Sequence, residues 1–302
     1  MLYSKLQMVA PVALLGAGLA MPGWLRAQQR VIDQLPDEES FAHGVGKSVQ
    51  PFFEGWQPMP DGHIVMWFGY LNLNYEEEPD VPIGPNNKFS LKDDLGQPTH
   101  FYPRRHWFVF QVDLPRDWDK EKRLTWTVTV NGHASAANGW LQPEWEVDEG
   151  VMQMNIGPGG APPVDPPNQA PKITGSGDQT AQVGKPIKLA VSATDDGIPK
   201  PRVRNPNAAA AAPPPRPPLP AGATPPPRAQ LGLRIRWELY RAPAEGGEVT
   251  FEPENTRPVM GGQSAELAST ATFSAPGTYW LRAVASDGML QTPYDVKVTV
   301  SR

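Results

Sequence analysis

Proline is concentrated in two stretches of the chain, and its distribution limits the possible folds more than any other feature of the sequence. The chain has 302 residues, of which 37 are proline, and the rich stretches run from Gly157 to Pro171 and from Gly197 to Ala229. Because proline fixes φ and lacks a backbone N–H, neither stretch can continue a central strand. We therefore predict a Pro/Gly-rich linker at residues 157–170 and a disordered, proline-rich insertion at residues 197–230.

The segments before the linker have the patterning of β-strands. Residues 124–130 (LTWTVTV) alternate apolar residues with threonine, and the turn-forming pair Asn131-Gly132 follows them. Residues 64–75 and 106–112 are rich in aromatic and β-branched side chains, and residues 147–156 are expected to form the last strand of this part. These patterns predict an all-β N-terminal domain at residues 28–156, a sandwich of two antiparallel sheets.

The strand expected at residues 64–75 is apolar on both of its faces. Ile64, Met66 and Phe68 lie on one face, and Trp67 and Leu71 lie on the other. In a two-layer sandwich the outer face of a sheet is normally polar, so something is expected to cover it. Two alternatives follow: either loops or the segment at residues 52–56 fold over this face, or the face is a contact surface for the second domain or a partner protein.

The segment after the linker carries a more specific pattern. Residues 168–173 (NQAPKI) open it, residues 183–197 (VGKPIKLAVSATDDG) follow, and residues 277–288 (GTYWLRAVASDG) lie near its end. Ile235, Trp237 and Leu239 share one face of a further expected strand. This order resembles the PKD-like and cadherin-like Ig-fold modules of bacterial secreted proteins. The resemblance implies that residues 171–302 form an Ig-like β-sandwich, that Trp237 is buried in it, and that its roles are spacing, adhesion or glycan association.

The rest of the chain gives no comparable resemblance. The N-terminal domain resembles only uncharacterised secreted bacterial β-domains, to which no activity can be attached. The fold class predicted for the whole chain is therefore all-β, with two β-sandwich domains, the second Ig-like, joined by a Pro/Gly-rich linker.

The first residues have the layout of a secretory signal. Lys5 supplies a positive charge, Met8 to Ala20 form an uncharged and mostly apolar run, and Leu25-Arg26-Ala27 offers a cleavage site. The run is shorter than the roughly 18 apolar residues that a membrane helix needs. We predict a signal peptide at residues 1–27, no integral membrane span in the mature chain, and a periplasmic, cell-surface or extracellular location.

Charge and cysteine content exclude several classes of function. The chain has no cysteine, so disulfides, thiolate metal sites and cysteine nucleophiles are excluded. Residues 28–160 carry a net charge of −10 and residues 161–302 a net charge of +3. Nucleic-acid binding depends on clustered Lys and Arg, so no nucleic-acid partner is expected for such an acidic first domain.

Candidate binding residues lie in the N-terminal domain. Trp140 and Trp145 lie in an expected loop, where an indole can stack on a sugar ring or pack into the core. Glu76 and Asp80 belong to an acidic stretch whose oxygens suit calcium, although solvated loop charge is the simpler interpretation. Asp195, Asp196 and Asp287 offer a similar set of oxygens in the second domain.

A metal site would need the histidines to converge in three dimensions. All five, namely His43, His63, His100, His106 and His133, lie in the N-terminal domain without a short ligand spacing. We expect no catalytic residue and no cofactor, with calcium as the alternative. The function predicted is an exported, non-enzymatic binding or cell-surface structural protein whose partner is an envelope glycan or a surface protein. The alternative is a hydrolase or metal-dependent enzyme with its site in the N-terminal domain.

Overall fold

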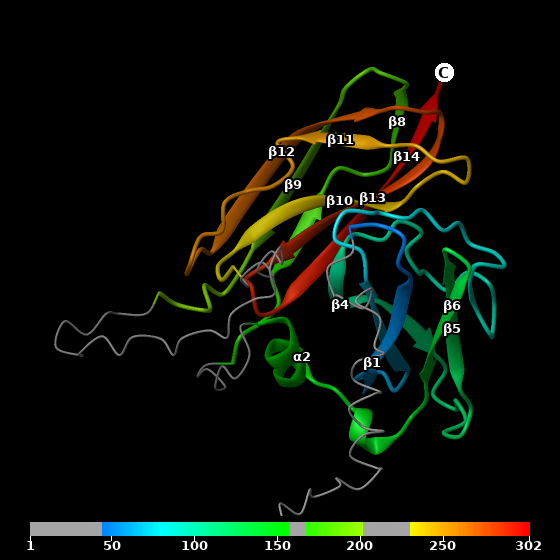
Figure 1. The fold of residues 1–302 in the computed structure, drawn as a ribbon. Helices are drawn as coiled ribbons and strands as arrows, with labels where there is room; N and C mark the ends of the chain where they lie inside the picture. The colour runs from blue at the N-terminus through cyan, green and yellow to red at the C-terminus, as the bar shows by residue number, and fades with distance from the viewer. Residues whose placement is uncertain (1–43, 158–166, 202–229) are drawn as a thin grey trace, which may run out of the picture. The chain divides into compact units, whose positions relative to one another are not determined.

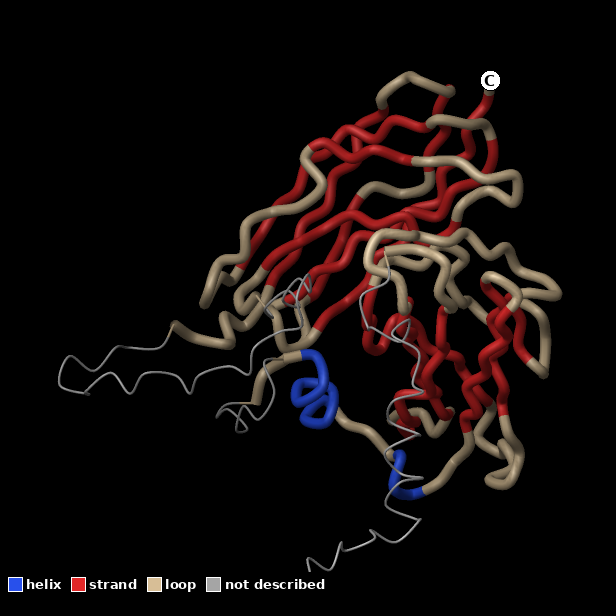
Figure 2. The backbone as a smooth tube through the Cα atoms, viewed as in Figure 1, coloured by secondary structure: helices blue, strands red, loops and turns tan. Residues whose placement is uncertain are grey.

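The computed structural model describes residues 44–157, 167–201 and 230–302, and Ala42–Arg302 form one compact unit. The signal peptide predicted at residues 1–27 and His43 lie outside the described residues, as do most of the predicted linker and of the proline-rich insertion. The described part is almost entirely β-structure, with one short α-helix (Figures 1 and 2). The all-β prediction is therefore confirmed.

The first β-sandwich consists of two three-stranded antiparallel sheets (Figure 1). One sheet has the order β1-β2-β4 and the other has the order β3-β5-β6. The strands are β1 (Val49–Pro58), β2 (Ile64–Asn72), β3 (Asn87–Phe89), β4 (Arg104–Leu114), β5 (Leu124–Val130) and β6 (His133–Gly139).

Aromatic side chains fill the space between these two sheets. In β5 the four apolar residues are buried and the three threonines are partly exposed, as the alternation predicts. The ring of Trp126 lies 5.0 Å from that of Phe110 and 5.9 Å from that of Phe89. Asn131 and Gly132 both have positive φ, 51° and 77°, as a tight two-residue hairpin turn requires.

The second β-sandwich has two four-stranded sheets with the strand order of an immunoglobulin-like domain. One sheet is β7-β9-β12-β11 and the other is β10-β13-β14-β8, which correspond to the two sheets of that fold. The strands are β7 (Lys172–Gly175), β8 (Gln179–Gln182), β9 (Ile187–Thr194), β10 (Arg234–Arg241), β11 (Val249–Glu252), β12 (Ser264–Phe273), β13 (Gly277–Ser286) and β14 (Gln291–Ser301).

Two side chains of the second sandwich have the positions expected in an Ig-like core. Trp237 of β10 is buried between the sheets with Ile235 and Leu239, so the predicted face of this strand is confirmed. Tyr279, near the start of β13, donates its hydroxyl hydrogen to the carbonyl oxygen of Ala275 at 2.9 Å. Such a tyrosine corner fixes the chain where it enters the strand.

The prediction of a strand at residues 147–156 is wrong. This segment forms helix α2 (Glu149–Ile156), preceded by the 3₁₀-helix η2 (Pro143–Trp145). The Asp148 carboxylate accepts a hydrogen bond from the backbone N–H of Val151 and so caps the helix. Met152 is its one buried residue, whereas Met154 is exposed. The alternation of Met152 and Met154 with polar residues is typical of a strand, whereas the N-cap hydrogen bond of Asp148 stabilises a helix.

The apolar outer face of β2 is covered by the second sandwich and by α2. The segment at residues 52–56 does not fold over this face, because it is part of β1 and pairs with the edge of β2. Instead, Trp67 and Phe108 pack in a cluster with Met152 of α2 and with Leu290, which lies just before β14. Of the two alternatives raised by the sequence, contact with the second domain is therefore confirmed.

Candidate functional site at the junction of the two sandwiches

A β-bulge in β4 prepares the surface on which the second sandwich docks. Phe110 pairs with Phe68 and His106 pairs with Tyr70, so three residues of β4 lie opposite Gly69 alone. A Cβ atom at Gly69 would lie 2.4 Å from the His106 carbonyl oxygen, so only glycine fits here. Phe108, in the middle of the bulge, has a φ of 47°. A positive φ at an aromatic residue costs free energy that the surrounding contacts must offset.

Side chains of the second sandwich satisfy the carbonyl groups of this bulge. Gln291 donates from Nε2 to the Trp107 carbonyl oxygen at 3.0 Å, and Arg282 donates from Nη1 to the Val109 carbonyl oxygen at 2.6 Å. Buried carbonyl groups need partners, and a bulge disturbs the ladder that would normally supply them. The bulge is therefore complete only when the second sandwich is in contact with it.

The end of β10 forms a second set of bonds, with the loop that precedes β4. The backbone N–H of Leu239 donates to the Tyr102 hydroxyl at 2.8 Å, and that of Thr99 donates to the Tyr240 carbonyl oxygen at 3.1 Å. Arg241 makes a bidentate ion pair with Asp94, at 2.7 and 3.0 Å. These contacts join segments about 140 residues apart in the sequence.

Tyr240 links the cores of the two sandwiches. It belongs to β10, yet its ring is buried in the hydrophobic core of the first sandwich. Its hydroxyl donates to the Gly96 carbonyl oxygen at 2.5 Å, and the guanidinium of Arg282 lies 3.5 Å from the ring centroid. Burial raises the pKa of Tyr240 to about 12, so the phenol stays neutral and remains a donor. Arg282 is held in turn by both carboxylate oxygens of Asp295.

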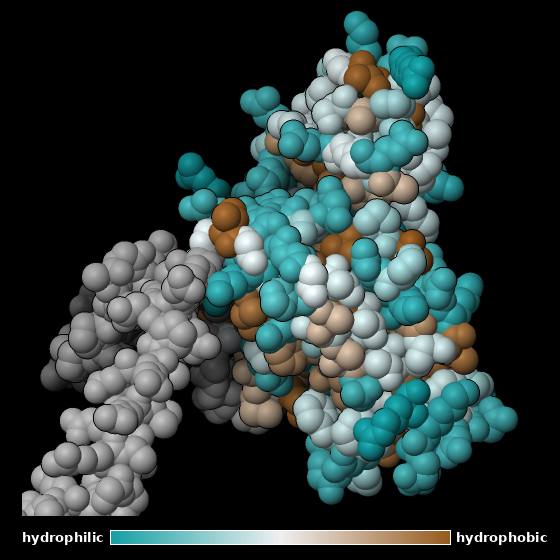
Figure 3. All heavy atoms as spheres, turned by 45° about the vertical axis from the view of Figure 1, so that its right-hand side comes forward, coloured by the Kyte–Doolittle hydropathy of each residue, from teal (hydrophilic) through white to brown (hydrophobic). Residues whose placement is uncertain are grey.

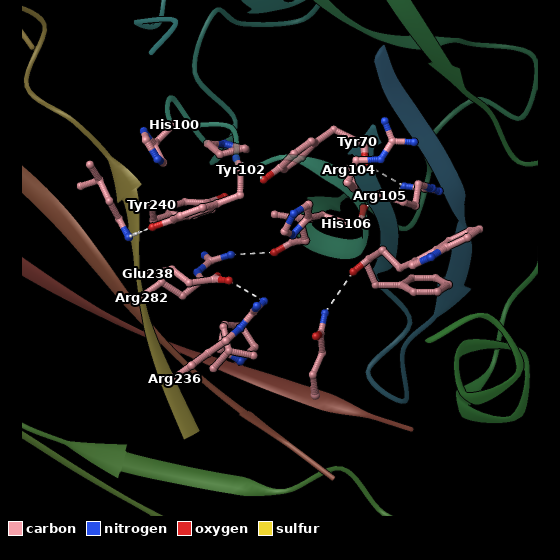
Figure 4. Close-up of a pocket in the computed structure, with 18 of the residues that line it drawn as sticks. Tyr70, His100, Tyr102, Arg104, Arg105, His106, Arg236, Glu238, Tyr240 and Arg282 are labelled. Carbon is pink, nitrogen blue, oxygen red and sulfur yellow. Dashed lines mark hydrogen bonds and ion pairs between the residues drawn. The ribbon is translucent and has the colours of Figure 1, made fainter. Parts of the chain in front are cut away.

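A cavity of about 460 Å³ lies beside these contacts (Figure 4). Tyr70, Tyr102 and His106 form an aromatic wall on the side of the first sandwich, while Arg236 and Glu238 lie on the side of the second. The ring centroids of Tyr70 and His106 are 4.8 Å apart and the rings are stacked. The Tyr70 hydroxyl accepts a hydrogen bond from the backbone N–H of Tyr102 at 3.0 Å. Burial lowers the pKa of His106, which keeps the imidazole neutral near pH 7.

Several charged groups at or near the cavity form ion pairs. Arg236 pairs with Glu238, and Arg105 pairs with Glu54 at 2.7 and 2.9 Å. Burial raises the pKa of Glu54 to about 7, against the opposing effect of Arg105. The guanidinium of Arg105 also lies 3.7 Å from the Trp107 ring centroid. The chemistry that such a lining offers to a ligand is aromatic contact and hydrogen bonding.

The candidate residues predicted from the sequence lie in two other places. Trp140 and Trp145 surround Phe53, with ring centroids 6.5 and 5.7 Å from it, and Trp145 is 42% exposed. Asp80 accepts a hydrogen bond from Nδ1 of His100 at 2.8 Å, and Glu76 donates its backbone N–H to the Gly44 carbonyl oxygen. The structure thus brings the two tryptophans together, and their role in binding stays a prediction.

The histidines have separate partners. His63 contacts Asp61, His100 contacts Asp80 and Glu78, and His106 contacts the Pro103 carbonyl oxygen. Desolvation opposes charge on His100, but its two carboxylate partners outweigh desolvation and raise its pKa to about 9. Across residues 44–157, 167–201 and 230–302, no group of three or more His, Asp or Glu side chains could hold a metal ion.

The three aspartates singled out in the second domain accept hydrogen bonds from loop residues. Asp196 accepts them from the backbone N–H groups of Gln169 and Ile198. Asp287 is fully buried and accepts hydrogen bonds from the backbone N–H groups of Met289 and Leu290 and from the Asn168 amide. Asp195 accepts from the N–H of Gly197, and burial raises its pKa to about 6. Calcium binding by these residues remains a prediction.

The residues that build the junction were not found from the sequence. Tyr240 and Arg282 are outward-facing positions of two Ig-like strands, where polar residues normally meet water. One signal was available. Leu239 and Tyr240 are adjacent large side chains in an otherwise alternating strand, and both are buried. A strand with adjacent buried residues has both of its faces covered.

Comparison with known proteins gives no family. No protein-family model matches the chain, and no curated protein matches it. Within the described residues, no helix is long and apolar enough to span a membrane.

Distant likenesses to solved structures exist. Domains 4 and 5 of the S-layer protein SbsC match with 10% identity and a TM-score of 0.24, over 60% of this chain and 66% of that one. The D00-D0 domain of intimin matches with 7% identity and a TM-score of 0.24, over 84% of this chain and 100% of that one. The N-terminal eight Ig domains of Down Syndrome Cell Adhesion Molecule match with 10% identity and a TM-score of 0.23, over 84% of this chain and 27% of that one. The chain thus spans about two thirds of the fragment with SbsC domains 4 and 5 and about a quarter of the eight-domain fragment of the adhesion molecule. Likenesses at these TM-scores carry no argument about function.

Proposed function

We propose that this chain is exported and works outside the cytoplasm as a non-enzymatic binding or structural protein, in which the two sandwiches act as one rigid unit. The observation that supports this proposal is Tyr240, a residue of the second sandwich that is buried in the core of the first. Two domains in one chain normally move against each other unless their interface is large and apolar. A shared core residue opposes such motion.

The bonds around Tyr240 have the same effect. The pair Arg241–Asp94 and the bonds from Arg282 and Gln291 to the β4 bulge cross between the two sandwiches and fix their docking angle. A fixed angle between two exposed surfaces suits a protein that presents a binding face or spaces other parts of a surface layer. The N-terminal segment, with Lys5, the apolar run from Met8 to Ala20 and the site at Ala27, supports export.

We also propose that residues 171–302 form a PKD-like or cadherin-like module and that residues 28–156 form the domain before it. The partner proposed for the whole protein is an envelope glycan or a surface protein. On the face drawn in Figure 3, the hydrophobic residues form small separate groups among hydrophilic ones, which favours a partner recognised through polar contacts.

The ionisation of His100 suits a structural role and not that of a general base. A general base must be unprotonated near the working pH. His100 has a pKa of about 9 and is therefore protonated near pH 7, bound to Asp80 and Glu78. Such a group holds a loop together and does not accept a proton from a substrate.

Two measurements test the proposal. Residues 1–30 are fused to a reporter enzyme that is active only after export, with Lys5→Glu plus Leu15→Arg as the inactive control. The full mature chain is then mixed with purified cell-envelope material and sedimented at low and physiological salt. We expect an active reporter and co-sedimentation that resists salt. An inactive reporter, or turnover of an envelope component by the purified chain, would contradict the proposal.

A further inference from the structure

A groove near the junction combines two tryptophans with two neutralised ion pairs. It has a volume of about 380 Å³ and is lined by residues of both sandwiches, among them Trp67, Gln111 and Trp280. A neighbouring depression of about 730 Å³ shares Arg241 and Trp280 with it. Trp280 therefore lies where the two hollows meet, on a surface to which both sandwiches contribute.

Trp280 is unusually exposed for an aromatic residue in a central strand. It belongs to β13, which is paired on both sides, and 37% of its surface is accessible. The guanidinium of Arg241 lies 5.5 Å from its ring centroid. Because this guanidinium lies over one side of the ring and helps to hold it in place, the accessible part of the indole offers an apolar surface that loses little further conformational entropy on binding.

The charged residues of the groove cancel one another. Arg241 binds both carboxylate oxygens of Asp94, and Arg282 binds both carboxylate oxygens of Asp295. The hydrogen bonds from Arg241 are the main cause that lowers the pKa of Asp94, so this carboxylate stays ionised at neutral pH. Each carboxylate has about four lone-pair positions, so the ion pairs leave acceptors for further donors. The groove is thus rich in fixed acceptors without a surplus of either charge.

Further polar groups lie around the indoles. Gln111 is exposed and supplies both a donor and an acceptor. The indole Nε1 of Trp67 has no hydrogen-bond acceptor among the described residues, and a buried donor without a partner costs free energy. This Nε1 has almost no accessible surface, so the part of Trp67 that the groove offers to a ligand is its ring and not its N–H group.

From these features we infer that the groove around Trp280 binds a neutral glycan. A sugar ring has an apolar face of C–H groups that stacks on an indole, and its hydroxyls donate to carboxylates and bond to amides. An anionic or cationic polymer would need unpaired charge of the opposite sign, whereas the groove's arginines and aspartates are already paired. This inference rests on the proposed function and names its binding site and its ligand class.

The test is affinity gel electrophoresis of the full mature chain in gels that contain pullulan, galactomannan or hydroxyethyl cellulose, with alginate as the anionic comparison. The variants are Trp280→Ala and Gln111→Ala. Leu91→Ala is the control, because Leu91 is an exposed large apolar side chain that does not line the groove. Trp145→Ala tests the competing site around Phe53. Circular dichroism and melting temperature confirm that each variant is folded.

We expect at least one neutral polysaccharide to retard the chain. Trp280→Ala should weaken this binding about tenfold or more and Gln111→Ala severalfold, with Leu91→Ala unchanged. Loss of binding in Trp145→Ala but not in Trp280→Ala would overturn the groove and leave the proposed function standing. Binding to alginate alone, abolished by salt, would also overturn it. If no polysaccharide retards the chain while envelope material still sediments with it, the groove fails and the proposed function survives. If no polysaccharide retards the chain and envelope material does not sediment with it either, the groove and the proposed function are both refuted.

Discussion

The two sandwiches differ in how complete they are. The core of the second is built, among the described residues, entirely from its own strands and contains Trp237 and Tyr279 in the positions typical of an Ig-like domain. The core of the first includes Tyr240, which belongs to β10 of the second. The first also has a bulge whose carbonyl groups are bound by Arg282 and Gln291. The difference teaches that the dependence is unequal: the first sandwich needs Tyr240 of the second to complete its core, whereas, within the described part of the chain, the core of the second contains no residue of the first.

The largest effect is expected from the core of the second sandwich. Trp237→Ala removes a fully buried indole and should lower the free energy of unfolding by about 3–5 kcal/mol. Because the first sandwich depends on the second, the loss should appear for both of them in urea titrations followed by near-UV circular dichroism. If the first sandwich kept its wild-type midpoint in this variant, the dependence would be refuted.

A slightly smaller effect is expected at the shared residue. Tyr240→Ala removes a buried ring from the core of the first sandwich and should cost about 3 kcal/mol. Tyr240→Phe is the matched control, because it keeps the ring and loses only the hydrogen bond to Gly96, worth about 1 kcal/mol. In both variants the loss should be larger in the first sandwich than in the second, as measured by hydrogen exchange in β2 and β5 compared with β9 and β12. Equal losses in both sandwiches would mean that the dependence is mutual.

The third prediction concerns pH and the loop that docks on β10. Hydrogen bonds to Asp80 and Glu78 raise the pKa of His100 from an ordinary 6.5 to about 9, although desolvation opposes this. A raised pKa means that the folded state holds the proton more tightly, so the stabilisation is complete below about pH 6.5. It is lost as the pH rises to about 9. We expect a fall of about 2 kcal/mol over this interval.

The control for this prediction is His100→Gln, which cannot titrate. Its free energy of unfolding, measured by urea titration at several pH values, should vary less between pH 6.5 and 9 than that of the unchanged chain. The same slope in both proteins would assign the pH dependence to another group.

The smallest effect is expected from the proline-rich insertion. Replacing residues 202–228 by a short glycine-containing turn should change stability by less than about 1 kcal/mol, because loop length enters the closure entropy only logarithmically. The melting temperature of the full chain measures this directly. A fall of more than about ten degrees would show that the segment packs against the second sandwich.

The second sandwich was more predictable from the sequence than the first. Its alternation places Ile235, Trp237 and Leu239 on one face, and such a local pattern survives folding because each strand has one buried face. In the first sandwich the pattern of residues 64–75 indicates that both faces of the strand are covered. It does not indicate which segments cover the outer face. That information depends on contacts between segments far apart in the sequence.

The junction shows the same limit. Arg282 is an ordinary surface residue by its position in β13, and it becomes a structural one only because the β4 bulge presents the Val109 carbonyl group to it. The bulge cannot be predicted from the sequence, because Phe108 has a positive φ although aromatic residues rarely adopt one. The groove around Trp280 was missed for this reason, whereas Trp140 and Trp145 were noticed because they lie in a short segment with Gly and Pro.

The central claim is that the two sandwiches form one cooperative unit joined through Tyr240 and Arg282. Differential scanning calorimetry of the full mature chain tests it most directly. We predict a single transition whose calorimetric and van't Hoff enthalpies agree, because a shared core cannot be broken in one sandwich alone without loss in the other. Two resolved transitions, or a calorimetric enthalpy about twice the van't Hoff value, would contradict the account.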